Sequence, residues 1–466
     1  MLWVGVPSEL SWGTSREDVK RYLMEIRDPI HGFIKLENEH EERILALPEF
    51  QRLRRIHQLA AAYLLYPGAT HTRFEHSLGT FHVATKLAKN ANLEDHRQET
   101  VRLAALLHDI GHGPFSHVSE YALKDLVVPG NAAETESLHE KITLGILRHI
   151  LYPRKDLNKQ QLQSLESVFD TAKYPMRTVE RDIISGKLDA DILDYLLRDS
   201  QYCGVKYGVY DLDRITQAAR VYHDPPYSHL AFAEEDCLAI DQVLFAKHYM
   251  DAQVYRHETR WIADAMLRRA IVTAAKRSRK LRALFSFSPD DPEWLQRWLG
   301  FDDYALEEEI MSRGTDEARD LVRRLKERRL LYRVLFEPIE LCGNTEFQER
   351  AVGAQTRVET VRSLEDEAAK ECGIKLRHLV FADVIEAPYP ETPEGLYLLS
   401  EQNHRTDYRQ VSHVFSGALA QGERREQRLV VYLPVDEPDR QRRQEKKAEY
   451  ANKIRELLKR EEAPDA

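Results

Sequence analysis

The sequence lacks a long apolar run, has few cysteines and has no excess of basic residues. Its longest uninterrupted apolar stretch, residues 59–66, is far shorter than the roughly 20 residues that a membrane-spanning helix needs. The four cysteines lie far apart and form no CxxC pair, which argues against a zinc knuckle and against a disulfide scaffold. The first residues lack the basic segment and long apolar stretch of a secretory signal. These absences predict a cytoplasmic protein that does not enter a membrane.

The charge balance is acidic, with 67 Lys and Arg against 77 Asp and Glu and a formal net charge of -10. A protein that grips a polyanion mainly through its overall field usually carries a basic excess. An anionic ligand must therefore be met by a local basic pocket or by a metal ion. Nucleic acid is accordingly the less favoured partner.

The 466 residues predict one large core with appended regions. Apolar residues recur at three-to-four spacing through the first half, which predicts helices. Three short β-type runs, at 378–387, 394–401 and 428–434, indicate a small α+β module. The predicted fold is mostly α, with a helical core and a smaller α+β C-terminal region. We expect a lead-in over 1–25, the core domain over 26–275, a charged helical region over 276–335, the α+β module over 336–435 and a charged, exposed helical tail over 436–466.

Polar residues gather where a buried helix should end. In "LLHDIGHGPFSH", His108 and Asp109 follow an apolar segment and are expected in the last turn of its helix. A lone His-Asp pair is more often a hydrogen-bonded core pair than a ligand pair. Here His76 stands at the start of another amphipathic helix, and Asp191 lies downstream among apolar residues. Two imidazoles and two carboxylates suit Mn, Fe, Zn or Mg, so these four residues predict one divalent metal ion, with room for a second.

The segment that contains Asp191 carries a polar stripe. Asp191, Tyr195 and Asp199 are spaced i, i+4 and i+8, so they share one face of the expected helix. Leucines and isoleucines cover most of the remaining helix surface. A buried row with two carboxylates is costly unless it binds a cation or a hydrogen-bonding ligand.

Further titratable residues follow the HD pair. His112, His117 and His139 lie close in sequence, the last beside Glu140. Any one of them is more often structural than catalytic, but their clustering near a candidate metal site favours catalysis. Because imidazole titrates near neutral pH, such a residue can protonate a leaving oxygen. We predict catalytic roles for His112, His117, His139 and Glu140.

The ordered H…HD…D pattern resembles the metal motif of the HD superfamily of metal-dependent phosphohydrolases. The matching stretches run in family order over about residues 26–260. They are "DPIHGFIKL", "FQRLRRIHQLAAAYLLYPGATHTRFEHSLG", "LLHDIGHGPFSH", "LHEK" and "DADILDYLLRDSQYCGVKYG". Within the superfamily the chain is most similar to the deoxynucleoside triphosphate (dNTP) triphosphohydrolases, the bacterial dNTPases and the HD core of the vertebrate SAM-and-HD-domain protein.

The resemblance implies an HD-domain core that hydrolyses dNTPs to deoxynucleoside and inorganic triphosphate. It implies that His117 protonates the departing 5′-oxygen, and that family members assemble as homo-oligomers, here a dimer or tetramer. It also implies substrate-binding residues: Arg73 beside the α-phosphate and base, Gln58 and Asp199 at the sugar 3′-OH, Leu59 against the sugar, Tyr195 on the phosphate side, Lys247 at the polyphosphate and Tyr255 at the 2′ position. Lys247, Asp251 and Tyr255 have the i, i+4, i+8 spacing of one helix face.

Three positions depart from the family pattern. Ile192 stands where a Lys or Arg usually reaches the polyphosphate, and Lys247 replaces an Arg, which loses bidentate phosphate binding. Both changes leave room for a mono- or diphosphate substrate or an altered base preference. Ala46 lacks the polar group that would read a guanine edge, although Gln51 and Arg54 match the activator-binding segment. Activation by a guanine nucleotide is therefore not expected.

Two other functions stay open on the sequence. One is an HD phosphatase or phosphodiesterase that acts on another nucleotide or on single-stranded nucleic acid ends. Gln58, Tyr255 and the acidic net charge speak against a polynucleotide substrate. The other is a non-catalytic nucleotide-sensing module, against which stands the presence of every metal position and all the nearby histidines. The native metal, the preferred base, any effector and the oligomer size are left undetermined.

Overall fold

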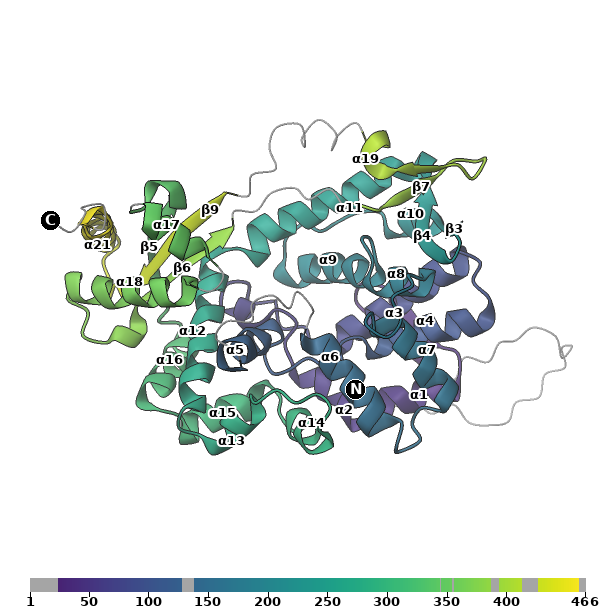
Figure 1. Ribbon diagram of the computed structural model, residues 1–466, viewed down its shortest axis with the longest axis horizontal. Coiled ribbons are helices and arrows are strands. Elements are labelled where there is room, and N and C mark those ends of the chain that lie inside the picture. Colours follow the sequence, from purple (N-terminus) through teal and green to yellow (C-terminus); the bar gives the residue numbers. More distant parts are fainter. Residues whose placement is uncertain are drawn as a thin grey trace, which may run out of the picture.

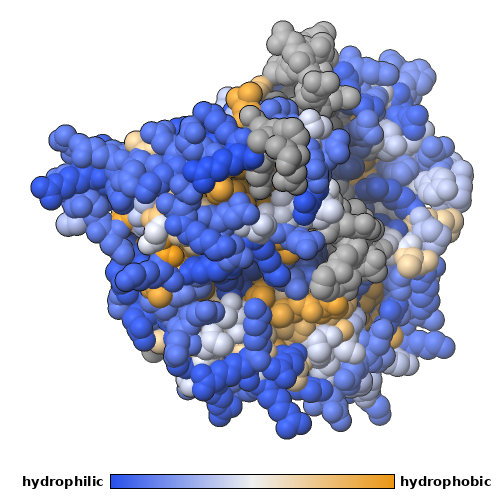
Figure 2. Space-filling model, turned by 60° about the vertical axis from the view of Figure 1, so that its left-hand side comes forward, coloured by the Kyte–Doolittle hydropathy of each residue, from blue (hydrophilic) through white to orange (hydrophobic). Residues whose placement is uncertain are grey.

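The structure, a computed structural model, describes residues 24–127, 138–343, 345–353, 356–386, 394–412 and 426–460. A large helical body carries a three-stranded sheet with its own helices at one end (Figure 1). The predicted fold class, mostly α with a smaller α+β C-terminal region, is confirmed. The lead-in predicted over 1–25 lies almost wholly outside the described residues. The face shown in Figure 2 is largely hydrophilic, and no helix in the described ranges is both long and apolar enough to cross a membrane.

The helical body is built from both halves of the chain. Its first part contains β1 (Met24–Asp28), β2 (Gly32–Leu36), α1 (Glu39–Ala46), α2 (Pro48–Gln51), η1 (Arg52–Arg55), η2 (Ala60–Leu64), α3 (Arg73–Asn90), α4 (Asp95–Leu107), α5 (His117–Val127), α6 (Leu138–Ile146), η3 (Leu147–Leu151), α7 (Lys159–Phe169), α8 (Val179–Ser185), α9 (Ala190–Cys203) and α10 (Leu212–Gln217). Its second part contains η4 (Glu234–Asp236), α11 (Cys237–Met250), η5 (Asp251–Tyr255), α12 (Glu258–Ala275), α13 (Arg279–Leu284), α14 (Pro292–Leu299), α15 (Asp303–Arg313) and α16 (Asp316–Lys326).

The helices that carry the polar motifs pack against one another, with α3 lying against both α4 and α9. α3 begins where the Glu75 carboxylate accepts the backbone N–H of Thr72 at 2.6 Å, half of a capping box. In α4, residues 101–107 are all buried, six of them apolar as predicted and the seventh, Arg102, paired with the Glu41 carboxylate. α9 contains the whole predicted polar stripe on one helix. The motifs thus converge because three helices share one core.

α4 ends at Leu107, so the expectation that His108 and Asp109 occupy its last turn is wrong. His108 is the C-cap of α4, with helical φ and ψ of -56° and -39°, and Asp109 lies in the turn that follows. Gly111 has no room for a side chain, because a Cβ there would lie 2.6 Å from the backbone nitrogen of Thr143 on α6. This close approach of α6 brings His139 beside the turn.

The loop between α4 and α5 is held by residues far away in the sequence. The buried Arg52 guanidinium donates to the carbonyl of His112 at 2.8 Å, and the Trp298 indole N–H donates to that of Gly111 at 3.0 Å. Asp303, the first residue of α15, accepts the backbone N–H of Phe115 at 2.5 Å. These contacts maintain Phe115 and the following serine at φ of 55° and 54°, a left-handed conformation that non-glycine residues rarely adopt.

The three β-type runs of the C-terminal region form strands, but in two different sheets. The first sheet has the order β5-β9-β6, with β5 (Tyr332–Pro338), β6 (Phe381–Glu386) and β9 (Gln427–Leu433). The second has the order β3-β4-β7-β8, with β3 (Ala219–Asp224), β4 (Tyr227–Ala233), β7 (Tyr397–Leu399) and β8 (Arg405–Asp407). β7 pairs parallel with β4 of the helical body. The prediction that residues 394–401 belong to the same module as the other two runs is therefore wrong.

A second hydrophobic core lies under the β5-β9-β6 sheet. It is covered by α17 (Thr345–Val352), α18 (Arg357–Glu371) and α21 (Arg440–Arg460), while η6 (Ile339–Leu341), η7 (Arg377–Leu379) and α19 (Tyr408–Val411) are short connecting elements. The predicted tail helix exists as α21, but its expected exposure is wrong on one face. Tyr450, Ile454 and Leu458 are buried in this core. The opposite side of the sheet meets α12, where Trp261 stacks on Tyr432 at 5.1 Å.

Candidate active site

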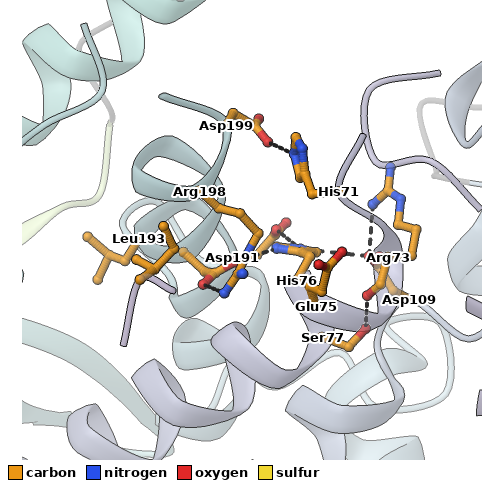
Figure 3. Close-up of polar contacts among 12 residues, drawn as sticks. His71, Arg73, Glu75, His76, Ser77, Asp109, Asp191, Leu193, Arg198 and Asp199 are labelled. Carbon is orange, nitrogen blue, oxygen red and sulfur yellow. Dashed lines mark hydrogen bonds and ion pairs between the residues drawn. The ribbon is translucent and has the colours of Figure 1, made fainter. Parts of the chain in front are cut away.

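The four predicted metal ligands converge from α3, α9 and the turn at the end of α4, and we call His76, His108, Asp109 and Asp191 the metal cluster. His76 Nε2 lies 2.8 Å from Asp191 Oδ1 and 3.7 Å from Asp109 Oδ2 (Figure 3). It lies 3.4 Å from His108 Nε2. Metal–ligand bonds of about 2.0–2.2 Å place neighbouring donors about 3 Å apart. His76, His108 and Asp191 lie close enough together to hold one divalent ion, and Asp109 lies beside them. The Asp191 side chain is 38% exposed and His76 is fully buried, so the cluster is open on the Asp191 side.

Both imidazoles of the metal cluster are oriented by their other ring nitrogen. His76 Nδ1 lies 2.8 Å from Asp194 Oδ2, and His108 Nδ1 donates to the Ala105 carbonyl at 2.7 Å. These contacts leave each Nε2 facing the cluster, which is the usual arrangement of metal-binding histidines. Burial lowers the pKa of His76, but Asp191 and Asp194 outweigh it and raise the pKa to about 10. The carboxylates therefore favour a positive charge at this point.

Asp194 is a supporting residue that the sequence analysis missed. Its carboxylate contacts His76 and the His31 ring at 2.6 Å, and forms a bidentate ion pair with Arg198 at 2.8 and 2.9 Å. Asp194 and Arg198 are both fully buried, and Arg198 also donates to Asp28 at 2.9 Å. The signal was present, because Asp194 and Arg198 are an i, i+4 pair among leucines on α9.

A second group adjoins the first, and we call His112, His117, His139 and Glu120 the histidine cluster. One Glu120 oxygen lies 2.8 Å from His139 Nδ1, 3.3 Å from His112 Nδ1 and 3.4 Å from His117 Nδ1. His112 stacks on His139 with ring centroids 3.9 Å apart. These four side chains also place enough donors together to hold a second ion. Sequence reasoning missed Glu120, although it follows His117 by one turn of α5.

The two clusters are joined through Asp109. His112 Nε2 lies 3.3 Å from Asp109 Oδ1, and Arg73 donates to Asp109 Oδ2 at 2.8 Å. Burial raises the pKa of Asp109, but Arg73, His108 and His112 hold it well below its ordinary value of 3.8. Asp109 is therefore an anion that a metal, a guanidinium and an imidazole can share.

Two members of the histidine cluster stand out: the His117 side chain is accessible, and the His139 ring interacts closely with a carboxylate. The His117 side chain is 53% exposed, whereas His112 is 1% exposed. Burial lowers the pKa of His139, but the Glu120 carboxylate outweighs it and raises the pKa above 6.5. Glu140, on the same helix as His139, adds to this rise. His117 is the member placed to meet a bound ligand.

The residues predicted at the sugar lie around Asp199. Its carboxylate contacts His71 Nε2 at 2.7 Å (Figure 3). It also accepts a hydrogen bond from the Tyr255 hydroxyl at 2.7 Å. The Tyr195 and Tyr255 rings meet edge to face with centroids 6.0 Å apart. The backbone N–H of Gln58 donates to the His71 carbonyl at 3.0 Å, which places Gln58 beside the same group. His71 was missed by the sequence analysis.

Gln58 and Leu59 line the buried side of this region. Both side chains are under 8% exposed, and the Gln58 Oε1 atom has no hydrogen-bond partner among the described residues. A buried carbonyl oxygen without a donor is costly. A ligand hydroxyl reaching Gln58 would satisfy it.

Lys247, the residue predicted at the polyphosphate, lies on α11, a helix that packs against α9. It makes no ion pair within the described ranges, although its charge acts on Asp189 at the start of α9. The expected helix face shared by Lys247, Asp251 and Tyr255 is wrong, because residues Asp251–Tyr255 form a π-helical turn. A π-turn widens the helix and changes the direction of every later side chain.

Packed helices that bury a His/Asp set and present a His/Glu set beside it define a metal-binding site suited to hydrolysis. Residues 73–199 match the family described as HD domain, and residues 210–456 match the HD associated region. The uncharacterized protein YwfO of Bacillus subtilis is 30% identical over 69% of this chain and 72% of its own length. The chain belongs to the HD-domain family of phosphohydrolases.

Other relatives cover less of their own length. Uncharacterized protein MJ1154 of Methanocaldococcus jannaschii is 38% identical, and the human deoxynucleoside triphosphate triphosphohydrolase SAMHD1 is 29% identical, each over 53% of this chain. The chain spans about half of these two proteins, 49% and 44% of their lengths. A solved phosphohydrolase from Bacteroides thetaiotaomicron superimposes with a TM-score of 0.70 at 25% identity, over 88% of this chain and 99% of that chain.

Proposed function

We propose that the protein is a metal-dependent dNTP triphosphohydrolase. The observation that carries this proposal is the position of Asp109, which joins the metal cluster to the histidine cluster through His112 at 3.3 Å. The likeness to a relative named as a dNTP triphosphohydrolase supports the choice of substrate. The pairing of Asp199 with Tyr255 beside Gln58 supports a sugar subsite.

The chain's own residues divide the reaction between them. His76, His108, Asp109 and Asp191 would hold a divalent ion, which supplies Lewis acidity to the phosphoryl oxygens. Arg73, held between Asp109 and the Ser116 hydroxyl at 2.9 Å, lies where it can neutralise the α-phosphate. His117 is the accessible acid for the departing 5′-oxygen, and its Nδ1 lies 3.4 Å from Glu120 Oε1, which orients the ring.

Product analysis tests the function directly. The full chain is incubated with Mn²⁺ or Mg²⁺ and each of the four dNTPs and four NTPs, and inorganic triphosphate and nucleoside are measured. Triphosphate release from at least one dNTP is expected. Absence of triphosphate from all four dNTPs would refute the proposal, whichever metal is supplied.

A second function is favoured by one feature of α9. Ile192 is buried and apolar next to Asp191, so it offers no charge to a polyphosphate. A phosphatase or phosphodiesterase that acts on a shorter phosphate chain is the alternative. Nucleoside mono- and diphosphates and labelled single-stranded oligonucleotides, assayed beside the dNTPs, separate the two functions by their products.

The Glu120→Gln variant is expected to shift the pH profile of hydrolysis. Glu120 raises the pKa of His139, so removing its charge lowers that pKa and deprotonates His139 at a lower pH. The alkaline limb of the kcat profile should move to lower pH by about one to two units, the usual effect of one adjacent opposite charge. The profile is measured from kcat between pH 5 and 10, and an unmoved alkaline limb would contradict the assignment.

The Tyr255→Ala variant is expected to lose discrimination between deoxyribose and ribose. The ring is fixed by its hydrogen bond to Asp199 and its contact with Tyr195, so it can crowd the 2′ position. The ratio of kcat/KM for dNTP over NTP should fall by about tenfold or more. Tyr249→Ala, an exposed tyrosine on α11, is the matched control and should leave the ratio unchanged.

We also propose a homo-oligomer of two or four chains in the cytoplasm. All four cysteines are buried and free, as expected in a reducing compartment. Light scattering of the eluting protein, with and without dNTP, gives the mass. A monomer under both conditions would contradict the assembly.

A further inference from the structure

A basic cavity lies apart from both clusters, where the end of α12, the start of α13 and the end of α15 meet. Its volume is about 640 Å³, and the lining contains Arg277, Arg279, Lys280 and Arg313. None of the lining residues belongs to the metal cluster or the histidine cluster. The sequence "KRSRKLR" supplies three of these cations within an acidic chain.

The positive charge of this cavity is poorly compensated. Within the part of the chain that the structure describes, Arg277 and Arg279 make no ion pair. Lys280 and Arg313 share a single carboxylate, Glu309, at the long distances of 3.8 and 3.7 Å. Four cations therefore face one anion, and this excess of positive charge favours the binding of an external anion.

The floor of the cavity is fixed before any ligand arrives. Glu309 and Ser278 are both buried, and the Ser278 hydroxyl donates to Glu309 Oε1 at 2.8 Å. The Lys280 ammonium lies over the Phe301 ring at 4.6 Å from its centroid. Because these groups are already ordered, a ligand has less conformational entropy to remove on binding.

The surroundings favour a compact anion over a long polyanion. Glu308 on α15 and Asp316 at the start of α16 are exposed next to the lining segments in sequence. A nucleic acid strand that extended past the cavity would meet these carboxylates. The cavity volume falls within the range of about 300–1,000 Å³ that small-molecule sites occupy.

We propose that this cavity is an oligophosphate-binding site, which takes inorganic triphosphate or the phosphate chain of a nucleotide. Guanidinium groups bind phosphate oxygens in bidentate pairs. A single phosphate would leave part of the four-cation set unpaired, whereas a chain of phosphates spreads its charge over all of it. The site does not depend on the proposed reaction, because no residue is shared with it.

Calorimetric titration of the full chain with inorganic triphosphate tests the site. In the Arg279→Glu/Arg313→Glu variant, the affinity of the cavity for triphosphate should fall by about tenfold or more. Lys375→Glu/Arg440→Glu, which makes the same charge change at exposed positions on the C-terminal unit, should bind as the wild type does. The milder Arg277→Gln/Arg279→Gln variant should weaken the same binding, which covers the case in which charge reversal disturbs folding.

A competition experiment shows whether the bound phosphate chain belongs to a nucleotide or is a free oligophosphate. Displacement of triphosphate from the cavity by a non-hydrolysable dNTP analogue would identify a nucleotide, and failure to displace it would identify a free oligophosphate. Unchanged triphosphate binding in both cavity variants would overturn the proposal. The proposal would also be overturned if the cavity variants bound a single-stranded oligonucleotide more weakly but bound triphosphate as the wild type does.

Discussion

The Asp109→Asn variant is expected to lose hydrolysis by at least about 1,000-fold, as when one member of an interdependent catalytic set is removed. The change keeps the shape of the side chain but removes the charge that the metal cluster, Arg73 and His112 share. Metal content should fall as well, because an amide is a weaker ligand than a carboxylate for a divalent ion. Activity is followed by triphosphate release, and bound metal by elemental analysis of the purified protein.

The matched control for this prediction is Asp241→Asn. Asp241 is also buried and accepts hydrogen bonds from Tyr408 and from Ser412 at 2.8 Å, but it lies outside both clusters. Its variant should keep metal and most activity if it folds. Full activity in Asp109→Asn would instead favour the non-catalytic nucleotide-sensing function.

The Asp194→Ala variant is expected to lower the free energy of unfolding by about 3–5 kcal/mol, the cost of leaving a buried charge without its partner. Arg198 is fully buried, and its bidentate contact with Asp194 would be lost. His76 would lose the acceptor of its Nδ1, so metal affinity should also fall by about 10–100-fold. Urea unfolding of the metal-free protein measures the first effect, and metal titration measures the second.

The pH dependence separates this charge effect from a simple loss of packing. Burial raises the pKa of Asp194, but Arg198 outweighs it, so the pKa lies well below 3.8. Its contribution to stability is therefore present above pH 3.8 and is lost as pH falls through the lowered pKa. The difference in free energy of unfolding between wild type and the Asp194→Ala variant should therefore become smaller at acidic pH. Asp213→Ala, which breaks an exposed pair with Lys86, should cost less than about 1 kcal/mol.

The sequence predicted those parts of the site that depend on short-range pattern. The buried helix before His108, the helix that begins before His76 and the stripe on α9 follow from apolar periodicity, and all three are present. The convergence of their side chains came from the family resemblance, because periodicity gives no distances between helices. Glu120 and Asp194 were missed for a related reason. A carboxylate on a helix looks like a surface residue until the packing shows what lies against it.

Each error has a physical cause that the local sequence pattern does not report. α4 ends at Leu107, and α6 packs against Gly111 just beyond it, a contact that no local propensity reports. β7 pairs with β4 because a short apolar strand joins whichever edge the chain brings near, and here that edge belongs to the helical body. The π-helical turn at 251–255 was not predicted, because the spacing of its residues is also compatible with an α-helix. The amphipathic face of the tail was hidden by its many charges.

The contacts of Arg52, Trp298 and Asp303 determine how small a working fragment can be. The turn that carries His108, Asp109 and His112 owes its left-handed residues to groups as distant as α15. A piece of chain that stopped at the end of α12 would contain every metal ligand and still leave that turn unsupported. Recombination between relatives should therefore exchange the segment through residue 303 as one inherited block, because a foreign α14–α15 connection would alter the turn on which the chemistry depends.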